Sequence, residues 1–245
     1  MSKYAYLSKI DKQIILAKNC TANDINKVFY CPDPNCNCEV KLVSYNSNKR
    51  KAHFRGNNHS ENCIFYHSNL NDINEFDVTN FSPSNLLDII TKAKNRTNDN
   101  NFKTDTDKVN DQSDKKYINT IKALYYLAIN YPVSYEINGY KISDLVCYKN
   151  TAHIYTKFIR GIKLVVCDFY YYNTDSNTIY FRYNNSIILK AVFDTSELFK
   201  KAQKDFYEKE NVIIFANWDS SGGYSTANIS NYKQLNIISG RDNRN

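Results

Sequence analysis

The alternation of apolar and polar positions is most regular after residue 153. A long run, IYTKFIRGIKLVVCDFYYYN, predicts one extended strand with Gly161 at a bend or bulge. Two shorter runs alternate apolar with polar side chains, as half-buried strands do, and an amphipathic helical pattern separates them from two last strands. We expect these elements at residues 154–173, 177–184, 186–193, 194–210, 211–219 and 224–238.

This order of elements, with the helix between the third and fourth strands, resembles the OB-fold, a small Greek-key barrel. The resemblance implies an OB-like five-stranded β-barrel with one helix over residues 151–245. Other five-stranded barrels share much of this order. The expected fold class for the whole chain is α+β.

The chain before the barrel divides by composition into three parts. Residues 1–68 contain most of the cysteines and histidines. Residues 69–114 combine a short helical pattern, PSNLLDIITKAK, with a polar stretch from 95 to 114 that we interpret as a flexible linker. Residues 115–150 predict a helix followed by a hairpin around Asn138-Gly139. The expected boundaries between units therefore fall near residues 68, 114 and 150.

Composition restricts the compartment and the partners. No apolar run approaches the roughly 18 residues of a membrane-spanning helix, and charges interrupt the apolar positions near the N-terminus, unlike a signal peptide. We therefore expect a cytoplasmic protein with no membrane partner. The net charge of +7 and the 21 tyrosines favour a polyanionic partner, because tyrosine on a basic surface stacks on bases. An AT-rich genome, which enriches Tyr, Asn, Lys and Ile together, is the alternative explanation.

Four of the seven cysteines and two of the four histidines lie between residues 31 and 63. A reducing compartment keeps thiols free, so clustered Cys and His indicate a metal site more than disulfides. Zn²⁺ takes four thiolate or imidazole ligands in a tetrahedron, and four protein ligands make a structural site. The alternative is a set of buried free thiols and surface histidines. The expected zinc ligands are Cys31, Cys36, His53 and Cys63, with Cys38 and His59 as alternates.

The segments YCPDPNCNCEVKLV and KRKAHFR, with the later Cys63, resemble the N-terminal zinc-finger segment of the competence-nuclease (CoiA-like) family. The resemblance covers roughly residues 20 to 68. The spacing from Cys31 to Cys36 is longer than the family's CPxC, which leaves Cys36 and Cys38 open. Gly56 stands where the family has a second histidine, so His59 is its expected substitute if a second imidazole is needed.

The family resemblance also implies a nuclease, whose restriction-type site needs an acidic pair and a lysine around Mg²⁺. Pro32-Asp33 and Glu39-Val40-Lys41 supply those residue types. They are interleaved with the expected zinc ligands, so one short segment would have to build two metal sites. We therefore expect no catalytic residues, and a metal-dependent nuclease remains the alternative.

The barrel favours binding instead. In an OB-fold the face of the second and third strands and the neighbouring loops receive single strands. Aromatic side chains there would stack on bases while Lys and Arg contact phosphates. The expected nucleic-acid-binding residues are Lys157, Arg160, Lys163, Tyr170, Tyr172, Tyr180, Arg182, Lys190, Trp218 and Tyr224.

These observations lead to one hypothesis and two alternatives. We expect a non-catalytic zinc protein, of bacterial or mobile-element origin, that binds single-stranded DNA or RNA. The alternatives are a metal-dependent nuclease of the CoiA-like type and a protein-interaction or inhibitor module, in which the barrel would grip a protein partner.

Overall fold

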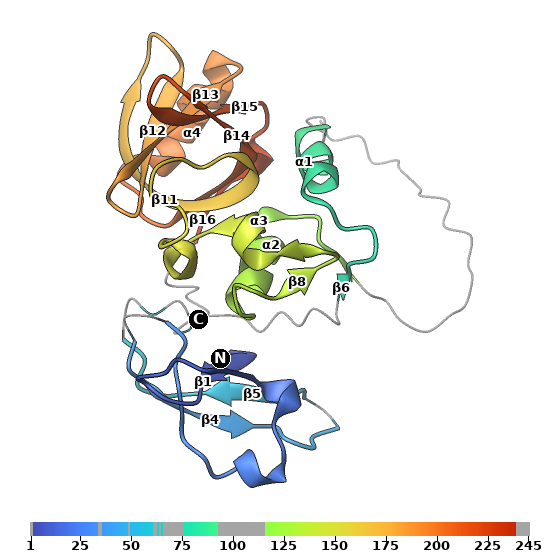
Figure 1. Cartoon of the computed structure of the whole chain (residues 1–245). Coiled ribbons are helices and arrows are strands. Elements are labelled where there is room, and N and C mark those ends of the chain that lie inside the picture. Colours follow the sequence, from blue (N-terminus) through green and yellow to red (C-terminus); the bar gives the residue numbers. More distant parts are fainter. Residues whose placement is uncertain are drawn as a thin grey trace, which may run out of the picture.

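The computed structural model describes residues 2–33, 36–48, 50–60, 63, 65, 76–92 and 116–238. The chain is an α+β protein with three hydrophobic cores, and the expected fold class is confirmed. Figure 1 shows the barrel in yellow to red, a green helical layer below it and the blue N-terminal module beyond that layer. The stretch expected to be a linker, 95–114, lies outside the described residues.

The C-terminal part is a closed five-stranded barrel with OB-like topology. Its strands follow the order β11-β12-β13-β15-β14 and return to β11, and β13 pairs with β15 in parallel. The short helix α4 lies between the third and fourth barrel strands, as expected. The elements are β11 (Gly161–Asn173), β12 (Thr178–Tyr183), β13 (Ile187–Phe193), α4 (Ser196–Phe206), β14 (Val212–Ser221) and β15 (Tyr224–Ile229).

Side-chain alternation fills the barrel. Ile179 and Phe181 on β12 and Leu189 on β13 point inward and are completely buried. The helix α4 begins after Thr195, whose hydroxyl accepts from the backbone N–H of Leu198. It buries Phe199, Ala202 and Phe206 in the same core.

The helical layer, residues 76–92 and 116–151, covers the outer side of β11 and β14. Leu164 of β11 and Phe215 of β14 are completely buried in the core of this layer. The strand β10 pairs in parallel with β11, so the sheet continues across residue 150. The layer contains β6 (Phe76–Asp77), α1 (Pro83–Lys92), β7 (Lys116–Tyr117), α2 (Ile121–Ile129), β8 (Glu136–Ile137), β9 (Tyr140–Lys141), α3 (Ile142–Leu145), β10 (Val146–Cys147) and η4 (Lys149–Thr151). The hairpin expected at Asn138-Gly139 joins β8 to β9, and both residues have positive φ, as a primed turn requires. The strand β16 (Leu235–Ile237) pairs with β14 at the other edge.

The N-terminal module, the described residues 2–65, is a curled five-stranded sheet in the order β2-β1-β3-β4-β5. Its strands are β1 (Tyr4–Tyr6), β2 (Ile14–Leu16), β3 (Phe29–Tyr30), β4 (Glu39–Val43) and β5 (His53–Arg55), with the short helices η1 (Ala17–Asn19) and η2 (Ala22–Asp24) between β2 and β3. Ser2 bridges Phe54 of β5, so the sheet curls back on itself. Phe29, Val40 and Phe54 fill its interior.

Specific contacts hold this module against the helical layer. The backbone N–H of Lys3 donates to the carbonyl of Asn130 (3.3 Å), and the side-chain amide of Asn150 donates to the hydroxyl of Tyr4 (3.3 Å). Lys149 Nζ lies 2.8 Å from Asp33 Oδ1, whose side chain is fully buried. The N-terminal module is thus anchored by a buried carboxylate two residues after Cys31. Across the described part of the chain, every helix is too short or too polar to cross a membrane.

Candidate metal centre and barrel face

Four side chains of the N-terminal module converge on one point. Cys31, Cys36, His59 and Cys63 each offer one ligand atom, and all four atoms lie within 4.8 Å of one another. Tight turns bring them together, because the N–H of Cys36 donates to the carbonyl of Asp33 (3.0 Å) and that of Cys63 to Ser60 (2.9 Å). Such a Cys3His group could hold a metal ion, and we call these four residues the metal group.

Three of the six separations among these ligand atoms are close to those of tetrahedral coordination. With Zn–S bonds of about 2.3 Å and Zn–N bonds of about 2.0 Å, tetrahedral ligands place two sulfurs about 3.8 Å apart and a sulfur and a nitrogen about 3.5 Å apart. Cys31 Sγ lies 3.6 Å from Cys63 Sγ, and His59 Nδ1 lies 3.5 Å from Cys36 Sγ and 3.3 Å from Cys63 Sγ. A disulfide would need about 2.05 Å, and all seven cysteines are free thiols.

The hydrogen bond between the thiols of Cys31 and Cys63 shifts the pKa of both groups. The hydrogen bond to Cys63, reinforced by burial, raises the pKa of Cys31. The same hydrogen bond, together with the one to His59, lowers the pKa of Cys63. One proton is shared between the two thiols, and a metal ion that takes both as thiolates would displace it.

His53, which the sequence analysis placed among the four ligands, lies outside this group. Its Nδ1 is 3.0 Å from the carbonyl of Lys51, and its side chain is buried on β5, opposite Val43. Burial lowers the pKa of His53, so its imidazole is a neutral core residue. The structure brings the alternate, His59, to the three cysteines instead. His53 is fixed in the β-ladder, whereas His59 follows it in a loop.

Cys38, the other alternate, also lies apart from the group. The backbone N–H of Cys31 donates to the carbonyl oxygen of Cys38 (2.9 Å), and Cys38 Sγ donates to the carbonyl oxygen of Glu39 (3.2 Å). It lies against Gly56, where an added Cβ would be 2.6 Å from Cys38 Sγ and 2.8 Å from the carbonyl oxygen of Glu39. Gly56 therefore permits a close approach of two chain segments behind the metal group.

The residue types of the nuclease alternative do not converge. Asp33 is buried and engaged with Lys149, whereas Glu39 and Lys41 are exposed on the outward face of β4. Asp33 faces the protein interior while Glu39 and Lys41 face solvent, so the three side chains do not surround a common Mg²⁺ position.

The second candidate site is a set of outward side chains on the barrel, which we call the barrel face. Tyr171 and Tyr180 stack with ring centroids 4.2 Å apart and an interplanar angle of 9°. The guanidinium of Arg182 lies 4.0 Å from the centroid of Tyr170, and Tyr224 contacts Tyr180 edge-on at 5.8 Å. Lys190 of β13 is the register partner of Tyr180. The barrel face consists of Tyr170, Tyr171, Tyr180, Arg182, Lys190 and Tyr224.

A β-bulge makes this arrangement possible. Strict alternation would send Tyr170 and Tyr171 to opposite sides of β11. The register with β12 shifts between Phe169 and Tyr171, which inserts an extra residue and leaves both tyrosines exposed on the outer side. Neither ring is buried, with 45% of Tyr170 and 41% of Tyr171 exposed.

Several residues expected at the binding surface lie elsewhere. Trp218 is only 2% exposed and belongs to the barrel core, where its Nε1 donates to the carbonyl of Lys163 (3.2 Å), so it is not available for stacking. Tyr172 turns toward α4 and packs edge-on against Phe199 at 6.4 Å.

Of three further basic residues expected at this surface, Arg160 borders the barrel face and the other two lie elsewhere. Arg160 Nε donates to the hydroxyl of Ser220 (2.7 Å), which places it beside the β14–β15 hairpin. Lys163 donates to the carbonyl of Asp144 and lies over the ring of Tyr155. Lys157 is exposed in the loop before β11. All three belong to the segment that enters the barrel, and Arg160 lies beside the hairpin that carries Tyr224.

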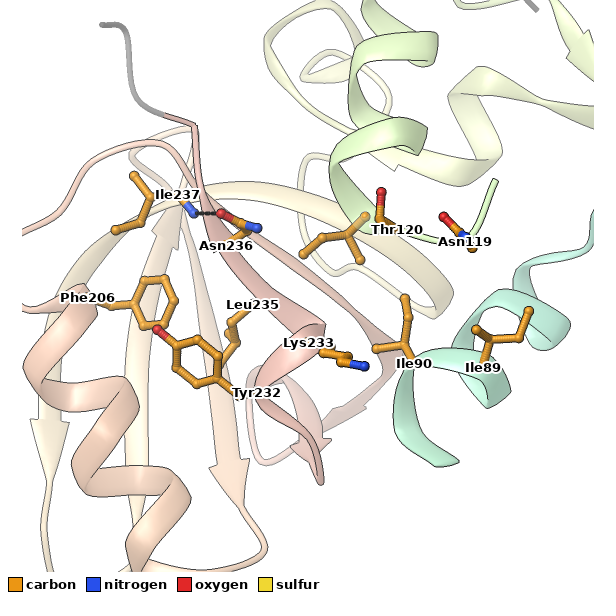
Figure 2. A pocket seen from close by; sticks show the side chains of 11 residues that line it. Ile89, Ile90, Asn119, Thr120, Phe206, Tyr232, Lys233, Leu235, Asn236 and Ile237 are labelled. Atoms are coloured by element: carbon orange, nitrogen blue, oxygen red, sulfur yellow. Dashed lines mark hydrogen bonds between the residues drawn. The ribbon is translucent and has the colours of Figure 1, made fainter. Parts of the chain in front are cut away.

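A hollow of about 560 Å³ lies between the barrel and the helical layer. Figure 2 shows Ile89 and Ile90 of α1 on one side and Phe206 of α4 on the other. The hydroxyl of Tyr232 already donates to Asp205 Oδ2 (2.6 Å). Most of the lining is apolar, and its remaining polar side chains are those of Asn119, Thr120, Lys233 and Asn236, so we assign no ligand to the hollow. No pattern in the sequence indicated it, because its walls come from four distant segments.

Comparisons with known proteins were negative: no protein-family model matches the chain, and no curated protein or solved structure is similar to it. The resemblance of residues 20 to 68 to the competence-nuclease family therefore rests on the quoted segments alone. The function has to be inferred from the metal group and the barrel face.

Proposed function

We propose that this protein is a non-catalytic, zinc-containing nucleic-acid-binding protein that engages unpaired bases of single-stranded DNA or RNA on the barrel face. The observation that carries the proposal is the aromatic and cationic composition of that face. Every base offers a π-face, so exposed tyrosines bind single strands without sequence preference. Arg182 and Lys190 supply positive charge for the phosphates beside them.

Zn²⁺ is the metal that best suits the N-terminal group. Three thiolates and one imidazole are soft and borderline ligands, and tetrahedral S/N sites are typical of zinc. Four protein ligands leave no open position for a substrate, so the role of the ion is structural. Cys31 and Cys36 hold one end of the site, and His59 and Cys63 tie the following loop to it.

The position of Tyr180 in the barrel face provides the test. It lies between Tyr171 and Tyr224, so Tyr180→Ala removes the centre of the aromatic array. Stacking of each base contributes about 1 to 3 kcal/mol, so we expect affinity for a labelled single strand of about 15 nucleotides to fall roughly tenfold or more. Fluorescence anisotropy at low salt, with one DNA and one RNA strand, measures the change.

Tyr117→Ala is the matched control, because Tyr117 is 60% exposed on β7 of the helical layer, away from the barrel face. It should bind as the wild type does. The proposal is wrong if the wild type shows no saturable binding to either strand, or if the two variants bind equally. Saturable binding by a purified protein partner in place of oligonucleotide would support the interaction-module alternative.

A further inference from the structure

The positive charge of this protein is concentrated at one end. Residues 1–60 contain ten Lys and Arg against four Asp and Glu, an excess of six out of the net +7 of the whole chain. Two of those four carboxylates are already neutralised, because Asp24 pairs with Lys27 (2.8 Å) and the buried Asp33 pairs with Lys149 (2.8 Å). The remaining residues, 61–245, contain 22 Lys and Arg against 21 Asp and Glu, a net charge of only +1.

Part of this charge lies on the outward side of the β4–β5 hairpin. Lys41 of β4 and Arg55 of β5 are direct register partners, and both side chains are exposed. Directly opposed side chains in an antiparallel pair lie on the same face of the sheet. Within the described part of the chain neither forms an ion pair, although Glu39 lies two residues before Lys41 on the same strand face.

Like charges placed opposite each other destabilise a sheet, so this pair costs stability in the isolated protein. An anion bridging the two cations would remove that repulsion. Two further cations lie nearby. Arg50 is exposed in the turn of the same hairpin. Lys9 lies 4.9 Å from the ring centroid of Tyr30, and Tyr30 pairs with Glu39 of β4. Several cations on and beside the β4–β5 hairpin offer more than one contact, which suits a chain of phosphates better than a single small anion.

We infer that the Lys41–Arg55 face of the N-terminal module binds the phosphate backbone of a single-stranded nucleic acid and carries most of the salt dependence of binding. This inference rests on the proposed function, and it gives the Lys41–Arg55 face, which lies outside the barrel, the role of contacting phosphates. The barrel face stacks on bases, and the hairpin contacts phosphates, so the two surfaces respond differently to salt. Release of counterions contributes a slope of about −0.7 per phosphate contact for single strands.

The test compares two double variants that lose the same charge. Lys41→Gln with Arg55→Gln removes the opposed pair, and Lys200→Gln with Lys204→Gln removes two exposed lysines of α4. Affinity for a single-stranded thymidine oligonucleotide is measured over a salt series. We expect the first variant to flatten the plot of log affinity against log salt by about 1.4 units, for two lost contacts, and the second to leave it unchanged.

Two controls separate the inference from the proposed function. The Lys41 and Arg55 variant should have a Tm equal to or above that of the wild type without nucleic acid, because it relieves repulsion; a lower Tm would contradict the opposed-charge argument. Tyr180→Ala should lower affinity while keeping the wild-type slope. If the wild type binds and both double variants keep its slope, the hairpin assignment is wrong and the proposed function stands. If the wild type does not bind, both are wrong.

Discussion

At the scale of single residues, the metal group depends on which of several equivalent side chains the backbone turns inward. Cys36 and Cys38 are two positions apart, and spacing could not decide between them. Backbone hydrogen bonds give the two residues different positions. The carbonyl of Cys38 accepts from the N–H of Cys31 and its side chain lies against Gly56, whereas the N–H of Cys36 donates to Asp33 in a tight turn. The sequence predicted a group of three cysteines and one histidine, and the structure contains such a group, whose exact members depend on these turns.

Metal content distinguishes the two sets of residues. We expect Cys36→Ser and His59→Ala to lower zinc well below one ion per chain, because each removes a convergent ligand. Their neighbours, Cys38→Ser and His53→Ala, should retain it. Elemental analysis of the purified variants measures this. Full metal in the first pair and loss in the second would assign the ligands to Cys38 and His53 instead.

The thiols of Cys20, Cys147 and Cys167 lie outside the metal group, and burial raises the pKa of each. Burial raises the pKa of Cys20 to about 11 and that of Cys147 to about 12. Burial likewise raises the pKa of Cys167 well above its ordinary value. These thiols stay protonated near neutral pH and behave as small apolar side chains.

At the scale of elements, alternation predicted the barrel well and its surface in part. The period of two placed Phe181 inside and Tyr180 outside, and both assignments agree with the structure. The bulge in β11 could not be predicted, because it depends on pairing with β12 rather than on local sequence. Trp218 could have been assigned correctly, since it shares its parity with Ile214 and Ala216, while polar residues occupy the opposite parity at the end of β14.

The core position of Trp218 predicts a large effect of its removal. Trp218→Ala leaves a cavity in the barrel and should lower the free energy of unfolding by about 3 to 5 kcal/mol. Tyr171→Ala removes an exposed ring on the neighbouring strand and should cost less than about 1 kcal/mol. Urea unfolding followed by circular dichroism measures both. Equal stabilities would place Trp218 outside the core.

At the scale of the whole molecule, the metal group and the barrel lie at opposite ends of a continuous arrangement. The helical layer shares a core with β11 and β14, and it holds the N-terminal module through Asp33–Lys149 and Tyr4–Asn150. Composition indicated separate parts but could not reveal how the N-terminal module is held, because Asp33–Lys149 and Tyr4–Asn150 each join residues more than a hundred positions apart. The domain boundaries proposed from the sequence remain a prediction.

Removal of the metal should affect one end only. We expect a strong chelator to disorder the N-terminal module, because binding energy of the ion is folding energy in small metal sites. Trp218 is the single tryptophan of the chain and reports on the barrel alone, so its fluorescence emission should stay constant while hydrogen exchange at β3 and β4 accelerates. A red shift of Trp218 emission on chelation would show instead that the barrel depends on the metal.

The pairing of β11 with β14 also affects the order in which the protein can be made. On the ribosome the N-terminal module emerges before any barrel strand. The first half of β11 pairs with β10 on one edge, and its other edge has no partner until β14 is made. A chain shortened before β14 would therefore present an unpaired, sticky strand edge to its neighbours.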